Sequence, residues 1–237
     1  MKKLIILDIV GLSKKQFEKL KPKNISKILE HGSYGSFDPS FPAVTCSVQA
    51  SIFSGTYPSE HGIISNGYYD ELFKKISFWE QPANLVKKPR IWDLLKKNNP
   101  DFSTALLFLQ NSLYANSNVV LTPKPLHLEN KMVMWCYSKP ENFYEKITES
   151  IGNFDLKSYW GPFSSLKSSN WIINSAKIAI QNHLPDLLVT YLPHLDYTSQ
   201  KFGPNSDEFK KSVDELDILI GDFLLFLNQE YPNTYEI

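Results

Sequence analysis

Residues 4–11 read LIILDIVG, and this stretch determines the fold that we expect. Its first four residues, Leu4–Leu7, form a continuous apolar run, which is typical of a central strand buried on both faces of a parallel sheet. A second such run, Leu187–Leu192, lies near the other end of the chain. Strand-like and helix-like patterns alternate between the two runs. The sequence therefore predicts an α/β fold, with a mostly parallel sheet and helices on both faces.

The last predicted helix, Asp207–Gln229, has the clearest pattern. Its apolar residues recur at helical spacing and form one packing face, as expected of a helix that covers a sheet. Residues 111–130 are polar and irregular. We expect one domain over residues 1–237, with a rim insertion around residues 111–165. The other helices are predicted over residues 14–20, 24–30, 91–97, 142–151 and 169–181, and the other strands over residues 105–109 and 132–135.

Composition narrows the class of protein. The 237 residues are 42% apolar and 21% charged, with 25 basic and 25 acidic side chains and a net charge of zero. A protein that coats a nucleic-acid polymer, or a polybasic membrane anchor, needs an excess of positive charge. A small phosphate-ester substrate needs only local charge, so it stays compatible with this composition.

The sequence predicts a cytoplasmic protein that has no membrane partner. The apolar run at the N-terminus is interrupted by Asp8 and is shorter than a signal-peptide core of about seven to fifteen residues. No stretch approaches the roughly 20 apolar residues of a membrane span. The two cysteines, Cys46 and Cys136, are too isolated for a disulfide framework. Cys46 could be a reactive thiol or a small buried helix residue.

Residues 41–70, FPAVTCSVQASIFSGTYPSEHGIISNGYYD, carry the functional signal. Pro42 ends an extended segment, because proline restricts itself and the residue before it. Thr45 follows at a predicted helix start, where unpaired N–H groups and the helix dipole favour an anion. The same field would stabilise a threonine alkoxide and a bound phosphate. Alternatively, Thr45 is only a helix cap, which is a common position for threonine.

This segment resembles the nucleophile segment of the type I phosphodiesterase/nucleotide pyrophosphatase family, within the alkaline phosphatase superfamily. It contains FP, a threonine, an SG turn, YP, HGI and an asparagine before YD, in the order and spacing of that family. Two distant segments agree with the resemblance. LIILDIVG contains Asp8, and LLVTYLPHLDYTSQKFGP (residues 187–204) reads as a strand followed by a polar loop with Asp196.

The resemblance implies roles for four residues. Thr45 would be the nucleophile, and Asn66 would donate to a phosphate oxygen. Asp8, Thr45 and Asp196 would bind divalent metal ions, with Zn²⁺ as the first expectation and Mn²⁺ or Mg²⁺ as alternatives. His61, in the HGI element, reads as a structural residue. Each role has a plainer alternative, such as a turn for Asn66 and an aspartate satisfied by loop amides for Asp8.

The sequence also departs from the family pattern. Gln200 occupies the position of a metal-binding histidine, and an amide is a poorer zinc ligand. The C-terminal ligands of the family, a later Asp-His-Gly segment and a histidine, are not in this chain, so we expect it to lack the C-terminal part. His194 could replace a missing ligand or contact substrate at the rim. Tyr68 and Tyr69 could belong to an aromatic wall for a planar group, although aromatic residues at such spacing are more often core.

Two classes of function follow from this resemblance. The first is a metal-dependent hydrolase of phosphodiester or pyrophosphate bonds that uses a threonine nucleophile. The same scaffold also hydrolyses phosphonates, phosphomonoesters and sulfate esters, and the sequence does not rank these substrates. The second class is a catalytically incomplete relative that acts as a binding protein, which the Gln200 substitution and the missing ligands favour.

Overall fold

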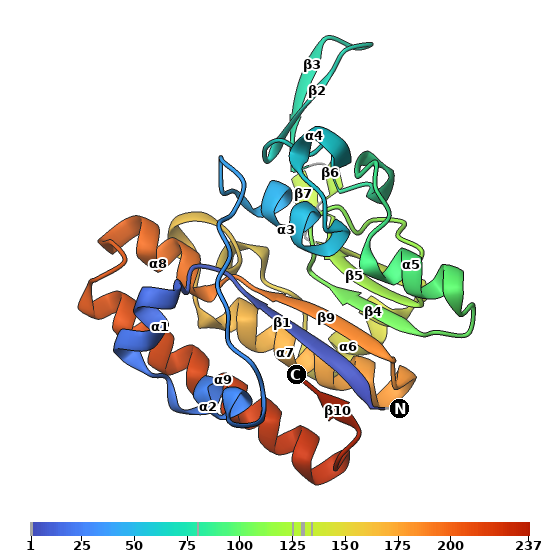
Figure 1. The fold of residues 1–237 in the computed structure, drawn as a ribbon. Helices are drawn as coiled ribbons and strands as arrows, with labels where there is room; N and C mark the ends of the chain where they lie inside the picture. The colour runs from blue at the N-terminus through green and yellow to red at the C-terminus, as the bar shows by residue number, and fades with distance from the viewer. Residues whose placement is uncertain (1, 80, 125, 129–130, 134) are drawn as a thin grey trace.

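A six-stranded sheet forms the centre of the computed structural model, which describes residues 2–79, 81–124, 126–128, 131–133 and 135–237 (Figure 1). The strand order is β10-β1-β9-β4-β5-β8. Every neighbouring pair is parallel except β5 and β8, which run antiparallel at one edge. The predicted mostly parallel sheet is confirmed. The strands are β1 (Lys3–Ile9), β4 (Thr104–Leu107), β5 (Val119–Pro123), β8 (Cys136–Lys139), β9 (Leu187–Leu192) and β10 (Tyr235–Glu236).

Helices cover both faces of this sheet, as predicted. On one face lie α3 (Thr45–Ser54) and α5 (Ile91–Asn98), joined by a ring contact of 5.3 Å between Phe53 and Trp92 (Figure 1). On the other face lie α7 and α9. Helix α7 spans Leu166–His183 and α9 spans Asp207–Glu230. The other helices are α1 (Lys14–Leu20), α2 (Lys23–Ile28), α4 (Pro58–His61), α6 (Phe143–Ile151) and α8 (His194–Phe202).

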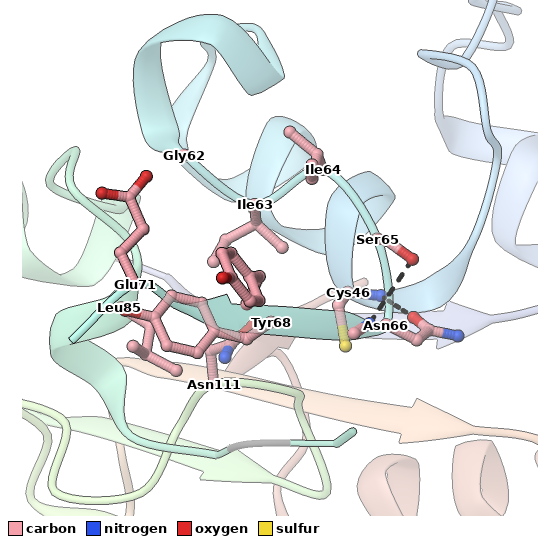
Figure 2. Close-up of a pocket in the computed structure, with 12 residues that line it drawn as sticks. Cys46, Gly62, Ile63, Ile64, Ser65, Asn66, Tyr68, Glu71, Leu85 and Asn111 are labelled. Carbon is pink, nitrogen blue, oxygen red and sulfur yellow. Dashed lines mark hydrogen bonds between the residues drawn. The ribbon is translucent and has the colours of Figure 1, made fainter. Parts of the chain in front are cut away.

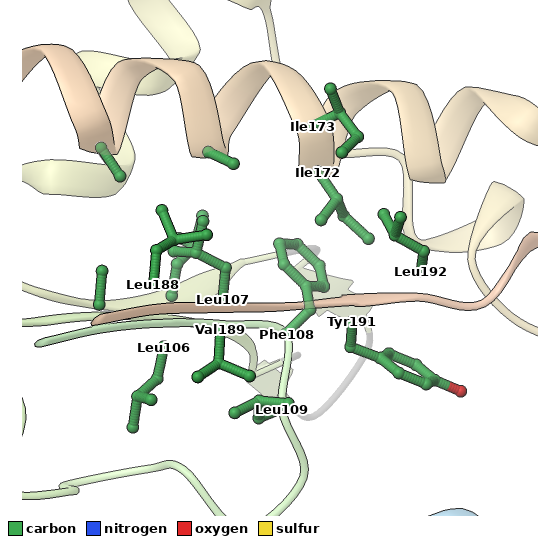
Figure 3. Close-up of a cluster of buried hydrophobic side chains, with 14 of the residues drawn as sticks. Leu106, Leu107, Phe108, Leu109, Ile172, Ile173, Leu188, Val189, Tyr191 and Leu192 are labelled. Carbon is green, nitrogen blue, oxygen red and sulfur yellow. The ribbon is translucent and has the colours of Figure 1, made fainter. Parts of the chain in front are cut away.

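The core is built from strand side chains that alternate between the two faces. Figure 3 shows Leu107 and Leu188 pointing toward Ile172 on α7, whereas Val189 and Tyr191 point to the opposite face. All six residues of β9 are buried. A strand buried on both faces must be apolar almost throughout, which explains why its bounds could be predicted.

Two small antiparallel hairpins stand outside the central sheet. One pairs β2 (Gly67–Asp70) with β3 (Lys75–Phe78), and it projects above α4 in Figure 1. The other pairs β6 (Leu126–Leu128) with β7 (Lys131–Val133). The predicted strand over residues 132–135 therefore starts in β7, and its residue 134 lies outside the described residues. Single turns of 3₁₀ helix occur at Leu29–His31, Ala83–Leu85, Leu156–Ser158 and Gly161–Phe163.

Two local predictions are wrong. Residues 111–130 are not irregular throughout, because Val119–Pro123 form the fully buried strand β5 of the central sheet. The polar segment that carries Asp196 is not a loop but the helix α8. The helix was not predicted because its sequence is mostly polar: His194 and Leu195 are the only buried residues of α8.

No helix within the described ranges is long and apolar enough to cross a bilayer.

Candidate active site

Asp8 lies next to the carboxyl end of β1, directly opposite Tyr191 on the parallel strand β9. Residues opposite each other in a parallel pair project to the same face, which here is the face covered by α3. The Asp8 carboxylate accepts a hydrogen bond at 2.7 Å from the Gln49 side chain. Burial raises the pKa of Asp8 to about 6, and the Gln49 hydrogen bond opposes that shift.

Thr45 is the first residue of α3, and Val44 holds the N-cap position. Because Val44 and not Thr45 holds the N-cap position, the alternative that Thr45 is a helix cap is wrong. The Thr45 side chain instead hydrogen-bonds with the Tyr191 hydroxyl. Burial raises the pKa of Tyr191, and the nearby carboxylates of Asp8 and Asp196 raise it further, so this phenol stays protonated at neutral pH. The Tyr191 hydroxyl thus interacts with Thr45 and is close enough to Asp8 and Asp196 to be affected by their charges.

Asp196 lies in the first turn of α8. The turn after β1 packs tightly against the start of α8, because a Cβ on Gly11 would lie 3.3 Å from the backbone nitrogen of Asp196. Gln200, one helical turn later, donates to Asp196 Oδ2 at 2.8 Å. Burial raises the pKa of Asp196, and the Gln200 hydrogen bond opposes the shift. At the position where the resemblance implies a histidine, this chain has a neutral hydrogen-bond donor to the carboxylate.

Asn66 is attached to the start of α3 by its side chain. Its Oδ1 accepts the backbone N–H of Cys46 at 3.0 Å (Figure 2). A backbone N–H can only donate, so the carboxamide must present its oxygen to Cys46 and its NH₂ group to the other side. Figure 2 shows that nitrogen pointing away from the helix backbone. One N–H of the helix start is therefore hydrogen-bonded to Asn66, and the NH₂ group of Asn66 faces away from the helix.

A cavity of about 280 Å³ lies beside Asn66 (Figure 2). Tyr68 and Tyr69 line it from β2, and they are 41% and 52% exposed. The expectation that they more often belong to a core is wrong here. Cys46 also lines the cavity, but burial raises the pKa of its thiol to about 12, which makes it a small buried residue and not a reactive thiolate.

The two histidines that the sequence singled out have side-chain partners other than Asp8 and Asp196. His61 is fully buried, accepts the Ile63 N–H at Nδ1 and contacts Ser51 with Nε2 at 2.9 Å, which confirms its structural role. His194 is also buried, and its Nε2 lies 3.2 Å from Glu215 Oε2 on α9. The pKa of His194 is lowered by burial, against the effect of Glu215.

The donor set tests the metal that the resemblance implies. Asp8, Asp196 and Thr45 supply two carboxylates and one hydroxyl near Tyr191, and burial disfavours the ionised carboxylates without a cation. Across the described part of the chain, however, no group of three or more His, Cys, Asp or Glu residues could hold a metal ion. The residues fit one side of a divalent-cation site and do not close it.

Sequence reasoning missed Gln49 and Tyr191. Gln49 lies four residues after Thr45, on the same face of α3, and Tyr191 lies two residues after Val189 on a strand, on the same face of the sheet. Both spacings can be read from the sequence. A glutamine in a helix or a tyrosine in an apolar strand does not indicate a functional site, however, until the positions of the neighbouring elements are known.

Comparison with known proteins agrees with this geometry. The model of the family described as type I phosphodiesterase/nucleotide pyrophosphatase matches residues 4–235. An uncharacterised pyrophosphatase/phosphodiesterase of Schizosaccharomyces pombe is 29% identical over 187 residues, which are 78% of this chain and 32% of the relative.

Solved structures share the fold at low identity. Murine ectonucleotide pyrophosphatase/phosphodiesterase 5, as an inactive threonine-to-alanine variant in complex with AMP, matches with a TM-score of 0.62 and 13% identity over 99% of this chain and 55% of that chain. Phosphonoacetate hydrolase from Sinorhizobium meliloti, in complex with phosphonoacetate, matches with a TM-score of 0.61 and 14% identity over 95% of this chain and 54% of that chain. The chain spans about a third of the curated relative and about half of these structures.

The mostly parallel sheet, its two helical layers and these neighbours define an alkaline-phosphatase-like α/β fold. Within that class, the chain belongs to the type I phosphodiesterase/nucleotide pyrophosphatase family.

Proposed function

We propose that this chain hydrolyses phosphodiester or pyrophosphate bonds of a small substrate, with Thr45 as the nucleophile and a divalent cation as cofactor. The observation that carries the proposal is the position of Thr45. It is the first residue of α3, and its side chain interacts with the Tyr191 hydroxyl, whose pKa is also raised by the carboxylates of Asp8 and Asp196. Family membership supports the reaction type.

In the proposed reaction, the Thr45 hydroxyl gives its proton to solvent and its oxygen attacks phosphorus in line with the leaving group. The leaving oxygen departs with its alcohol or phosphate and takes up a proton from solvent. The Thr45 O–P bond forms as the ester or anhydride O–P bond breaks. Asn66 donates through its outward NH₂ group to a phosphate oxygen, where negative charge develops. Water then cleaves the Thr45–phosphate ester and restores the hydroxyl.

Asp8, Asp196 and Thr45 would hold the cation. A bound divalent cation lowers the pKa of a coordinated hydroxyl and neutralises charge on the phosphate. All three donors are oxygen atoms, and oxygen donors suit Mg²⁺ and Mn²⁺, whereas zinc sites in proteins usually include imidazole or thiolate. We keep Zn²⁺ as a candidate, with Mn²⁺ and Mg²⁺ supported by this donor set.

The neighbours support a small phosphorus-containing substrate. One was solved with AMP, and its inactive form replaces a threonine by alanine. The other was solved with phosphonoacetate, which keeps phosphonates among the substrate classes. The cavity beside Asn66, with Tyr68 and Tyr69 on its wall, could receive the group attached to the phosphate.

A second candidate function is a catalytically incomplete relative that binds a phosphate ester without cleaving it. Two observations favour it: the described residues do not close a metal site, and Gln200 occupies Asp196 Oδ2 with a hydrogen bond. The two candidates differ in their need for metal. The enzyme should bind a divalent cation through Asp8 and Asp196, and the incomplete relative should bind it weakly.

Hydrolysis of bis(p-nitrophenyl) phosphate by the purified 237-residue chain tests the proposal. The assay compares Zn²⁺, Mn²⁺ and Mg²⁺, and it compares the wild type with Thr45→Ala and Thr45→Ser. The proposed function predicts metal-dependent hydrolysis that is lost in Thr45→Ala and partly kept in Thr45→Ser, which retains a hydroxyl. Absence of hydrolysis with every metal, from a folded wild type, would favour the incomplete relative.

A further inference from the structure

Gln49 connects the nucleophile helix to Asp8. It is buried on α3, with 5% of its side chain exposed, one helical turn after Thr45. Its Nε2 donates to Asp8 Oδ2 at 2.7 Å, and its Oε1 accepts the backbone N–H of Gln110 at 2.8 Å. The two ends of one carboxamide therefore hold the end of β1 and the loop after β4 to the same helix.

The orientation of this carboxamide is fixed by its partners. The Gln110 N–H can only donate, so the Gln49 oxygen must face it and the Gln49 NH₂ group must face Asp8. The loop that supplies this N–H is itself held. Gln81 donates to the Gln110 side chain and accepts the Asn111 N–H at 3.0 Å. The Gln49 NH₂ group therefore keeps pointing to Asp8 as long as that loop stays in place.

Nε2 takes one acceptor position of Oδ2, which makes Oδ1 the more available oxygen of Asp8. We propose that Gln49 is a positioning residue, which holds Asp8 so that this carboxylate offers a single oxygen to a cation beside Thr45. The inference rests on the proposed function for the role of Asp8 as a cation ligand, and it adds that the nucleophile helix itself sets the orientation of that ligand.

The position of Gln49 supports a role beyond packing. Residues four apart lie on the same face of a helix, so Gln49 and Thr45 move together as α3 moves. A displacement of α3 that carried Thr45 away from Asp8 would break the 2.7 Å hydrogen bond. Hydrogen-bond partners of metal ligands typically contribute about 10- to 100-fold to metal affinity, because they fix the orientation of the ligand.

Side-chain amide resonances of Gln49 test the contact directly, by NMR of the full chain without substrate. We expect one Gln49 amide proton to be shifted downfield and to exchange slowly in the wild type, and this signature to disappear in Asp8→Ala. Saturating Mg²⁺ should leave the signature in place, since a cation on Oδ1 does not compete with Nε2. Loss of the signature on Mg²⁺ binding, or a signature that persists in Asp8→Ala, would overturn the inference.

Binding of Mn²⁺ alone gives the second readout. Gln49→Met keeps the length of the side chain and removes both hydrogen bonds, and we expect it to weaken Mn²⁺ binding about tenfold. Gln16→Met is the matched control, because Gln16 is buried to a similar extent and hydrogen-bonds through both ends of its amide, with Ser13 and the Pro204 carbonyl. Equal Mn²⁺ affinity in the two variants would contradict the positioning role.

The two readouts separate this inference from the proposed function. If the wild type binds no Mn²⁺, the metal in the proposed function fails, and the amide signature alone decides whether Gln49 orients Asp8. If the wild type binds Mn²⁺, and Gln49→Met weakens this binding whereas Gln16→Met does not, the metal in the proposed function and the positioning role of Gln49 are both supported.

Discussion

The backbone N–H of Cys46 donates to Asn66 Oδ1 at 3.0 Å, so the helix that begins with Thr45 orients the amide of Asn66. Asp8 is held to the same helix through Gln49, at 2.7 Å. Two side chains that lie far from Thr45 in the sequence are thus positioned by α3. A rigid element that carries the proposed nucleophile and also fixes its neighbours would meet the geometric demand of in-line attack.

Replacement of Asn66 by aspartate should keep the hydrogen bond from the Cys46 N–H and remove the proposed donation to a phosphate oxygen. In Asn66→Asp, one oxygen still accepts the Cys46 N–H, but the other is negatively charged and cannot donate to a phosphate. We expect kcat/KM for bis(p-nitrophenyl) phosphate to fall about 10²- to 10³-fold, the usual cost of losing one such donor. Thermal unfolding should stay near that of the wild type. A variant with unchanged kcat/KM would show that Asn66 is only a turn residue.

Replacement of Gln200 by histidine should change the metal preference. Gln200 is exposed and donates to Asp196 Oδ2, and an imidazole at this position would supply a nitrogen ligand to a cation on Asp196. We expect Gln200→His to bind Zn²⁺ about tenfold more tightly than the wild type, in isothermal titration calorimetry. Lys201→His places an imidazole at the next exposed position and serves as the control. Equal affinity in these two variants would contradict this account of the Asp196 side of the site.

The raised pKa of Asp8 predicts how stability depends on pH. The folded-state pKa is about 6 and the unfolded value is near 3.8, so the folded protein binds the proton more tightly. The ionised Asp8 therefore costs folding free energy above about pH 6, and this cost vanishes below about pH 4. We expect Asp8→Asn to stabilise the fold by about 2 kcal/mol at pH 7.5 and by little at pH 4.

Urea denaturation at the two pH values measures this difference. Activity should move in the opposite direction, because asparagine is a poor cation ligand. An Asp8→Asn variant that is equally stabilised at both pH values would show that the ionised carboxylate is not the source of the cost.

His61 should prove structural in mutants. Both of its ring nitrogens have buried partners, the Ile63 N–H and the Ser51 hydroxyl. His61→Leu leaves these groups unpaired, and we expect the free energy of unfolding to fall by about 2–4 kcal/mol. Mn²⁺ affinity of the folded variant should be unchanged. Loss of Mn²⁺ binding without a loss of stability would instead identify His61 as a ligand.

The fold was predictable where burial dictates the sequence. Leu187–Leu192 lies in the middle of the sheet and all six of its residues are buried, so its bounds could be predicted from the apolar run. The long helix α9 was predictable from its apolar face, and the structure extends it by one residue to Glu230. Strand β5 was missed because its five buried residues lie between polar neighbours, which give a local window the character of a loop.

The candidate site was predictable only in part. The resemblance supplied Thr45, Asn66, Asp8 and Asp196, and the structure brings them to one edge of the sheet. The amide partners of these residues were not predictable, because a glutamine becomes informative only when its contacts are known. Gln49 and Gln200 each donate to a carboxylate of the site, and the sequence indicated only that Gln200 departs from the family pattern.

Mass spectrometry of the acid-quenched protein, after incubation with bis(p-nitrophenyl) phosphate and Mn²⁺ or Zn²⁺, tests the central claim most directly. The account predicts a p-nitrophenyl phosphate adduct, left after the loss of one p-nitrophenolate, on the peptide that contains Thr45, and its absence from Thr45→Ala. Undiminished hydrolysis by Thr45→Ala, or an adduct on a different residue, would contradict the assignment of Thr45 as the nucleophile.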